Sequence, residues 1–243
     1  LVNVESLNGI ESIGNLSRHR TVPIVVREQN GYEIRYVPAI SGESVAHAFQ
    51  ALLVESAKNK GLPVGHFSSR GELLKFTADE IMKQEGVTPP VDSQDARRAE
   101  IEIMLKDVVC DVGGFLYAGN VPIKRTSRFQ VGYMIPALDD IKASALEAQF
   151  HVRHAPSLIK TPASEKKAEE TKEPRGPTPY NVEVASAVYT LSFNIDIDGI
   201  SRPSTQYGKR IDAEKKLDEE REERIKATLM AFTNLLLNMS YGA

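Results

Sequence analysis

Two short stretches of basic residues have the types and spacing needed to bind phosphate groups. One surrounds Arg18 and Arg20 and follows a Gly-Asn turn, and the other runs from Lys124 to Arg128 after a glycine-rich segment. A guanidinium carries a planar fork of N–H donors that fits a phosphate. We predict that both stretches bind a nucleic-acid backbone, although a solvated surface loop is the alternative for each. The candidate residues are Asn15, Arg18, His19, Arg20, Lys124, Arg125, Ser127 and Arg128.

The second stretch also has side chains nearby that could stack on bases, since Tyr133 and Met134 follow it. A third candidate is the pair His151 and Arg153, which alternates with Phe150 and Val152. The two-residue period of a strand predicts that Phe150 and Val152 point inward and that His151 and Arg153 point outward. Cationic groups beside stacking side chains are typical of single-strand binding. An ordinary exposed strand face is the alternative for His151 and Arg153.

Residues with the spacing of an enzyme or metal site are missing from the sequence. The five histidines are scattered, and no P-loop, dinucleotide fingerprint or nucleophile elbow occurs. The single cysteine, Cys110, excludes an intrachain disulfide and a cysteine-based zinc site. We therefore predict no catalytic residue, no metal and no cofactor. General-base cleavage of RNA by His151 stays open as an alternative.

Charge is unevenly distributed along the chain. The 243 residues carry a net charge of −3, which by itself argues against nucleic acid, but acids concentrate at 165–173 and 212–223. The latter run is typical of a solvated helix face with i, i+4 pairs such as Glu220 and Arg224. With 41% hydrophobic residues the chain can bury a core. No apolar run is long enough to span a membrane, and the start is not a signal peptide. The single cysteine favours a reducing, cytoplasmic setting.

The elements that must position these residues begin with a hairpin. Val22–Arg27 and Tyr32–Val37 flank Asn30-Gly31, a strong hairpin signal. Because Tyr32, Ile34 and Tyr36 alternate with charged residues, we expect their face to be buried and the other to be solvated.

A helix follows from Ser41-Gly42 to about Gly61. Its apolar stripe is Val45, Ala48, Phe49, Leu52 and Leu53, while His47, Gln50 and Val54 lie off that stripe.

Further elements complete an α+β chain. Short helical pieces are expected at 61–95, a helix at 96–109, strands at 129–135, 148–153 and 180–197, and a long helix at 212–239. Residues 155–179, rich in proline and charge, predict a flexible loop. This order suits helices on one face of an antiparallel, ferredoxin-like sheet whose other face can bind single-stranded RNA.

Several strings of the sequence resemble one known family. They are Asn3–Asn15, Arg35–Ser44, Asp111–Gly119, Lys124–Arg128 and Glu147–Arg153. In this order they resemble the archaeal type I-A CRISPR Cascade backbone subunit, also called the DevR family, over almost the whole chain. That family starts a few residues earlier and continues further, so the resemblance implies that this chain is incomplete at both ends.

The resemblance implies a modified RNA-recognition-motif (RRM-like) palm with fingers and a thumb. It would be a single domain over residues 1–243, with a helical, finger-like insertion at 61–95 and 155–179 as the thumb or a neighbouring loop. His151 would be the characteristic histidine of the family. Ser41, Ser44, His47 and Gln50 would lie near RNA.

The implied function is that of a non-catalytic scaffold for CRISPR RNA in a Cascade-type antiviral complex. Expected partners are the single-stranded CRISPR RNA, a target DNA strand paired with that guide, other copies stacked helically, and other Cascade subunits, without a membrane. Two alternatives stay open. One is an RRM-like endoribonuclease that processes CRISPR RNA with His151, and the other is an interaction subunit whose acidic helix docks a partner.

Overall fold

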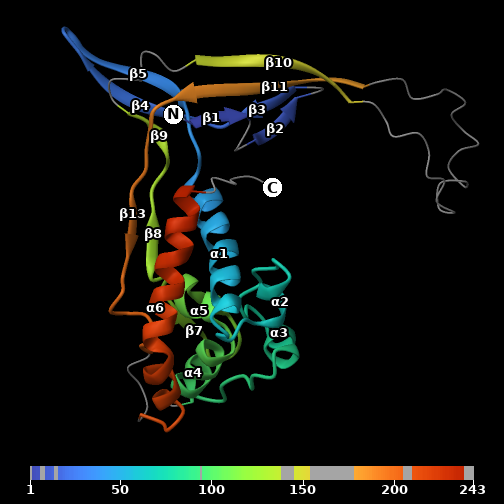
Figure 1. The fold of residues 1–243 in the computed structure, drawn as a ribbon, viewed down its shortest axis with the longest axis vertical. Helices are drawn as coiled ribbons and strands as arrows, with labels where there is room; N and C mark the ends of the chain where they lie inside the picture. The colour runs from blue at the N-terminus through green and yellow to red at the C-terminus, as the bar shows by residue number, and fades with distance from the viewer. Residues whose placement is uncertain are drawn as a thin grey trace, which may run out of the picture. The chain divides into compact units, whose positions relative to one another are not determined.

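The computed structural model describes residues 2–5, 9–13, 16–93, 95–137, 145–153, 178–204 and 210–237. The chain packs as two compact units (Figure 1). The first unit combines Leu1–Ser41 with Tyr133–Thr190, and the second combines Gly42–Gly132 with Leu191–Tyr241. Segments distant in sequence therefore meet within each unit.

The first unit contains a five-stranded mixed sheet. Its strands are β1 (Val2–Glu5), β2 (Gly9–Ile13), β3 (Leu16–His19), β10 (Ala145–Arg153) and β11 (Thr178–Ala187). β11 is central, because β10 pairs along it while β1 and β3 pair with successive parts of it. All pairs are antiparallel except β3 with β11. Two further strands, β9 (Ile135–Pro136) and β12 (Tyr189–Thr190), pair with each other.

The predicted hairpin forms, but its apolar face is not buried. β4 (Thr21–Glu28) and β5 (Gly31–Pro38) pair only with each other. Tyr32, Ile34 and Tyr36 are 77%, 65% and 73% exposed, whereas Arg35 on the other face is half-buried. The expectation of burial was wrong because alternation separates two faces without determining whether another layer covers either of them.

The second unit contains all the described helices. These are α1 (Gly42–Asn59), α2 (His66–Ser69), α3 (Asp79–Gln84), α4 (Ala96–Lys106), α5 (Val108–Gly113) and α6 (Glu214–Leu237). Two small ribbons accompany them, β6 (Phe115–Tyr117) with β7 (Ile123–Arg125), and β8 (Phe129–Val131) with β13 (Phe193–Ile195). The two long helices α1 and α6 lie side by side (Figure 1).

Four phenylalanines join these elements in the core of the second unit. The Phe49 ring of α1 lies 4.7 Å from Phe129 and 5.0 Å from Phe193, centroid to centroid, and Phe193 lies 4.9 Å from Phe232 of α6. The two contacts of Phe49 are edge-on, a favoured aromatic geometry. A second apolar cluster, which includes Met82, Ile103 and Tyr117, packs α3, α4 and the β6–β7 ribbon together.

Some of the secondary-structure predictions are confirmed, and others differ from the structure. The α+β class is confirmed, since helices occur with small and mostly antiparallel sheets. Val45, Phe49 and Leu53 are buried as expected, but Gln50 and Val54 are buried too, so the covered face of α1 is wider than the predicted stripe. The strand expected at 180–197 is divided into β11, β12 and β13. Of the loop predicted at 155–179, Thr178 and Pro179 belong to β11, and the rest lies outside the described residues.

Candidate nucleic-acid interface

In the first unit, the basic stretch at 18–20 forms the end of β3 and the residue after it. The Arg18 side chain is 44% exposed, with its Nε 3.9 Å from a carboxylate oxygen of Glu183 on β11. His19, by contrast, is buried, and its backbone N–H donates to the same carboxylate at 2.9 Å. Arg20 is half-buried. Of these three predicted phosphate ligands, Arg18 is the one with an exposed side chain.

The contacts and the burial of the His19 ring favour its neutral form. Its Nδ1 lies 2.8 Å from the carbonyl oxygen of Arg20, and its Nε2 is buried without a hydrogen-bond partner. Burial lowers the pKa of this imidazole, against smaller raising effects of the Arg20 carbonyl and Glu183. A neutral ring that donates from Nδ1 fits these contacts. The prediction that His19 contacts phosphate is corrected: its ring is an interior group.

His151 and Arg153 lie on β10, in the same sheet as Arg18. Their register partners on β11 are Tyr180 and Thr178. β3 follows the opposite edge of β11, where Leu16 is aligned with Asn181. The sheet thus brings two predicted binding segments to the two edges of one strand, while Asn15 lies outside the described residues.

The inward orientation predicted for Phe150 is wrong. Its side chain is 66% exposed, on the edge strand β10 of the sheet. As in the hairpin, strand alternation distinguishes two faces, but a covering layer from elsewhere in the chain decides which face is buried.

The four candidate residues in and just before α1 differ in their exposure to solvent. Ser41, just before the helix, and Gln50 are buried, Ser44 is half-buried, and His47 is exposed. The Gln50 side chain donates to the carbonyl oxygen of Ala46 at 3.0 Å. His47 lines a surface pocket together with Lys58, Ser68, Ser69 and other residues. His47 is therefore the candidate of α1 that is available to a ligand, and Gln50 has a structural contact instead.

Two glycines of the family-like strings lie so close to other backbone atoms that a side chain would not fit. A side chain at Gly42 would bring its Cβ within 2.7 Å of the Val131 carbonyl oxygen, where β8 ends. Gly114 has a φ of +68°, and its Cβ would lie 2.5 Å from the Arg125 carbonyl oxygen. Backbone approach this close excludes any larger residue. The glycine-rich segment and the basic stretch at 124–128 are therefore packed directly against each other.

The basic stretch at 124–128 alternates between solvent and interior. Lys124 is exposed on β7, whereas Arg125 is buried. The Ser127 hydroxyl donates to the carbonyl oxygen of Phe129 at 2.8 Å and accepts from its N–H at 3.2 Å. The half-buried Arg128 pairs with Asp196 at 3.2 Å. Of the predicted cluster, Lys124 is thus the cation whose side chain is presented to solvent.

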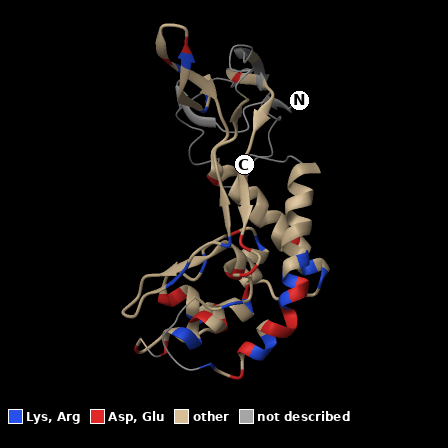
Figure 2. Cartoon of the chain, turned by 90° about the vertical axis from the view of Figure 1, so that its left-hand side faces the viewer, with Lys and Arg blue, Asp and Glu red and all other residues tan. Residues whose placement is uncertain are grey.

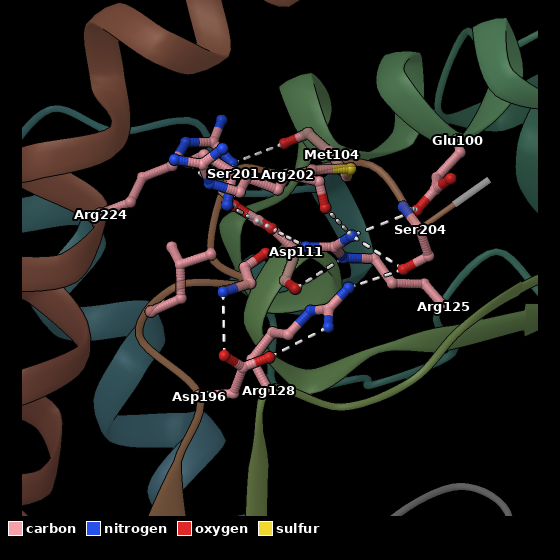
Figure 3. Close-up of polar contacts among 12 residues, drawn as sticks. Glu100, Met104, Asp111, Arg125, Arg128, Asp196, Ser201, Arg202, Ser204 and Arg224 are labelled. Atoms are coloured by element: carbon pink, nitrogen blue, oxygen red, sulfur yellow. Dashed lines mark hydrogen bonds and ion pairs between the residues drawn. The ribbon is translucent and has the colours of Figure 1, made fainter. Parts of the chain in front are cut away.

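Arg125 occupies a buried ionic network rather than a surface (Figure 3). Its Nη2 donates to Asp111 Oδ1 at 2.5 Å, and its Nη1 donates to Glu100 Oε1 at 3.1 Å. The remaining N–H groups reach the carbonyl oxygens of Asp111, Gly199 and Arg202. The prediction that Arg125 grips phosphate is corrected, because the fork of donors that suits a phosphate is already saturated by carboxylates and carbonyls.

Arg224 of α6 is the second cation of this network. Its Nη1 donates to Asp111 Oδ2 at 2.8 Å and to the Met104 carbonyl at 2.9 Å, and its Nη2 donates to Glu220 at 2.8 Å. The i, i+4 pair of Glu220 with Arg224 was expected, but on a solvated face, whereas Arg224 is fully buried.

Sequence reasoning missed Glu100, Asp111 and Arg224 as members of one network. The sequence does indicate that Glu100 could be buried, because this residue lies beside the apolar residues Ile101 and Ile103 of a predicted helix.

The charged half of α6 is visible in Figure 2 as mixed acidic and basic groups, with an uncharged second half. Several of these ion pairs lie at the surface, such as Lys226 with Glu222 at 2.7 Å and Lys215 with Asp212 at 3.0 Å. Paired Lys226 and Lys60 lower the pKa of Glu223 to about 2. The acidic run is therefore largely compensated by neighbouring cations.

Two features are missing from the residues that the structure describes. No group of three or more histidine, cysteine, aspartate or glutamate side chains there could hold a metal ion. Nor is any described helix long and apolar enough to cross a membrane.

One protein family and two curated proteins match all or nearly all of the chain. The family described as "CRISPR-associated negative auto-regulator DevR/Csa2" matches residues 1–243. The CRISPR-associated aCascade subunit Cas7/Csa2 2 of Saccharolobus solfataricus is 52% identical over 238 residues, which is 97% of this chain and 69% of that protein. The CRISPR-associated protein Cas7/Csa2 1 of the same organism is 36% identical over 243 residues, which is 100% of this chain and 70% of that protein.

A solved structure gives a weaker similarity. One chain of a "CRISPR RNA-guided surveillance complex, pre-nicking" has a TM-score of 0.40 and 11% sequence identity, covering 82% of this chain and 63% of that one. This TM-score is too low to assign a fold.

Proposed function

The chain belongs to the CRISPR-associated DevR/Csa2 family, and we propose that it is a non-catalytic scaffold subunit that holds a CRISPR RNA guide in a Cascade-type complex. The observation that carries this proposal is the 52% identity to an aCascade subunit over 97% of the chain.

The finer features of the proposal come from the resemblance. Copies would stack head to tail along the guide, each with an RRM-like palm, and a target DNA strand would be read by pairing with the guide rather than by protein. Binding would therefore depend on phosphates, and little on base identity. Other Cascade subunits would complete the complex.

The predicted RNA ligands differ in the exposure of their side chains. Arg18, His47 and Lys124 present exposed side chains, whereas His19, Gln50 and Arg125 are occupied inside the protein. We propose Arg18 and Lys124 as phosphate ligands. Asn15, His151 and Arg153 are retained as proposed contacts.

A salt series tests this function. Labelled single-stranded RNA of mixed sequence is titrated with the protein, and log K is plotted against log salt. Each phosphate contact contributes about −0.7 to the slope, so Lys124→Ala and Arg18→Ala should each flatten it by about that amount, regardless of RNA sequence.

The matched control is Lys215→Ala, which removes an exposed lysine that pairs with Asp212 in the acidic segment. This variant should keep the wild-type slope. A flat salt response of the wild type, or an equal loss in Lys215→Ala, would contradict phosphate-driven binding at the proposed residues.

A further inference from the structure

The β4–β5 hairpin presents an unusual solvent-exposed surface, which we call the aromatic face. By register, Pro23 pairs with Tyr36, Val25 with Ile34, and Arg27 with Tyr32, so the six side chains share one side of the ribbon. All six are exposed, including Val25 at 67%. Contiguous apolar groups on a surface mark interaction sites, because water contact with them is unfavourable.

Charge is segregated between the two sides of this ribbon. Arg35, on the opposite side, pairs with Glu28 at 3.2 Å and with Glu33 at 2.8 Å. The single charged residue of the aromatic face is Arg27, for which no ion pair occurs within the described part of the chain. Both acids of the ribbon thus lie on the side of Arg35, and the aromatic face carries one cation, Arg27.

The spacing of the aromatic face fits an extended strand of nucleotides. Same-side residues of a strand lie about 7 Å apart, so Tyr32, Ile34 and Tyr36 form a row about 13 Å long. The interval of about 7 Å suits successive nucleotides of an extended single strand, so Tyr32 and Tyr36, two intervals apart, would stack on alternate bases. Tyrosine rings stack on bases of any identity, and a guanidinium nearby can reach a phosphate.

We infer that the aromatic face is a base-stacking site for single-stranded RNA, with Tyr32 and Tyr36 as platforms and Arg27 as the phosphate ligand. This inference rests on the proposed function and adds to it the β4–β5 hairpin, which contains none of the binding residues predicted from the sequence. A second copy of the chain is a poorer occupant. The ribbon face covers roughly 200–300 Å², whereas a stable protein interface needs about 800 Å² on each partner.

Alanine and phenylalanine variants test the inference with the mixed-sequence RNA in a fluorescence anisotropy titration. Tyr32→Ala should weaken binding about five-fold, and Tyr32→Ala with Tyr36→Ala about 25-fold, without changing the salt slope, because stacking involves no counterion release. The double phenylalanine variant keeps both rings and should bind within about two-fold of wild type. Arg27→Ala should instead flatten the slope by about 0.7.

Two controls separate loss of stacking from loss of folding. Glu33→Gln alters the opposite side of the ribbon with the same shape, and it should bind like wild type. Photo-crosslinking of wild-type protein to RNA that contains 4-thiouridine should label the peptide holding Tyr32 and Tyr36, which requires no substitution.

The outcomes distinguish the two proposals. If wild type binds no RNA, the proposed function fails. If wild type binds but the double alanine variant loses less than two-fold and no crosslink maps to the hairpin, the stacking site alone is overturned. Unchanged RNA affinity with a smaller oligomer in light scattering would also overturn it and assign the face to a second copy.

Discussion

Replacing Arg125 by alanine distinguishes an interior role of this residue from an RNA-binding role. The guanidinium is fully buried and donates to Asp111 and Glu100 as well as to three carbonyl oxygens. Its removal leaves Glu100 with the Ser204 N–H and Asp111 with Arg224 and Ser201 as the remaining partners given by the structure. The substitution should therefore destabilise the second unit and leave the salt dependence of RNA binding unchanged.

The expected magnitude follows from the burial of both carboxylates. Removing one partner of a buried pair costs about 3–5 kcal/mol, because the remaining interior charges lose a directly hydrogen-bonded counter-charge. With a urea m-value of about 3 kcal/mol/M, the unfolding midpoint should fall by about 1–1.7 M. Arg125→Lys keeps the charge but has three donors in place of the planar fork, so its loss should be intermediate.

Urea unfolding followed by far-UV circular dichroism measures this effect, since all described helices belong to the second unit. The matched control is Lys124→Ala, which alters the adjacent exposed side chain. It should change stability by less than about 0.5 kcal/mol and flatten the salt slope of RNA binding by about 0.7. An Arg125→Ala protein within about 1 kcal/mol of wild type, with a flattened salt slope, would refute the interior assignment.

Three further predictions concern protons and cleavage. Burial lowers the pKa of His19 from 6.5, so folding favours the neutral ring. The contribution of His19 to the free energy of unfolding should therefore be complete above pH 6.5 and decrease below it. His19→Gln should reduce that decrease in thermal unfolding. Arg97 lowers the pKa of Glu214 from 4.5, so the contribution of this pair to stability is full above pH 4.5 and decreases in acid. Glu214→Gln should cost about 1–3 kcal/mol at pH 7 in urea unfolding, and this cost should shrink as the pH falls below 4.5. CRISPR repeat RNA incubated with the protein in EDTA should stay intact; discrete products that disappear in His151→Ala would instead support the endoribonuclease alternative.

Much of the local structure was predictable because it depends on neighbouring residues. The Asn30-Gly31 turn and its flanking alternation predicted the β4–β5 pairing, and the spacing of Val45, Phe49 and Leu53 predicted the buried face of α1. The family-like strings predicted membership of the DevR/Csa2 family, which the match over residues 1–243 confirms.

Which cations stay exposed was decided by tertiary structure alone. Lys124 and Arg125 are adjacent and equally basic, yet strand parity turns one to solvent while Asp111, Glu100 and the 199–202 backbone enclose the other. The same holds for Tyr32 and Tyr36, which are exposed because no layer from the described residues covers them. Periodicity is a local property of the chain, whereas burial and pairing are set by residues distant in sequence, and so only the folded units distinguish exposed cations from interior ions.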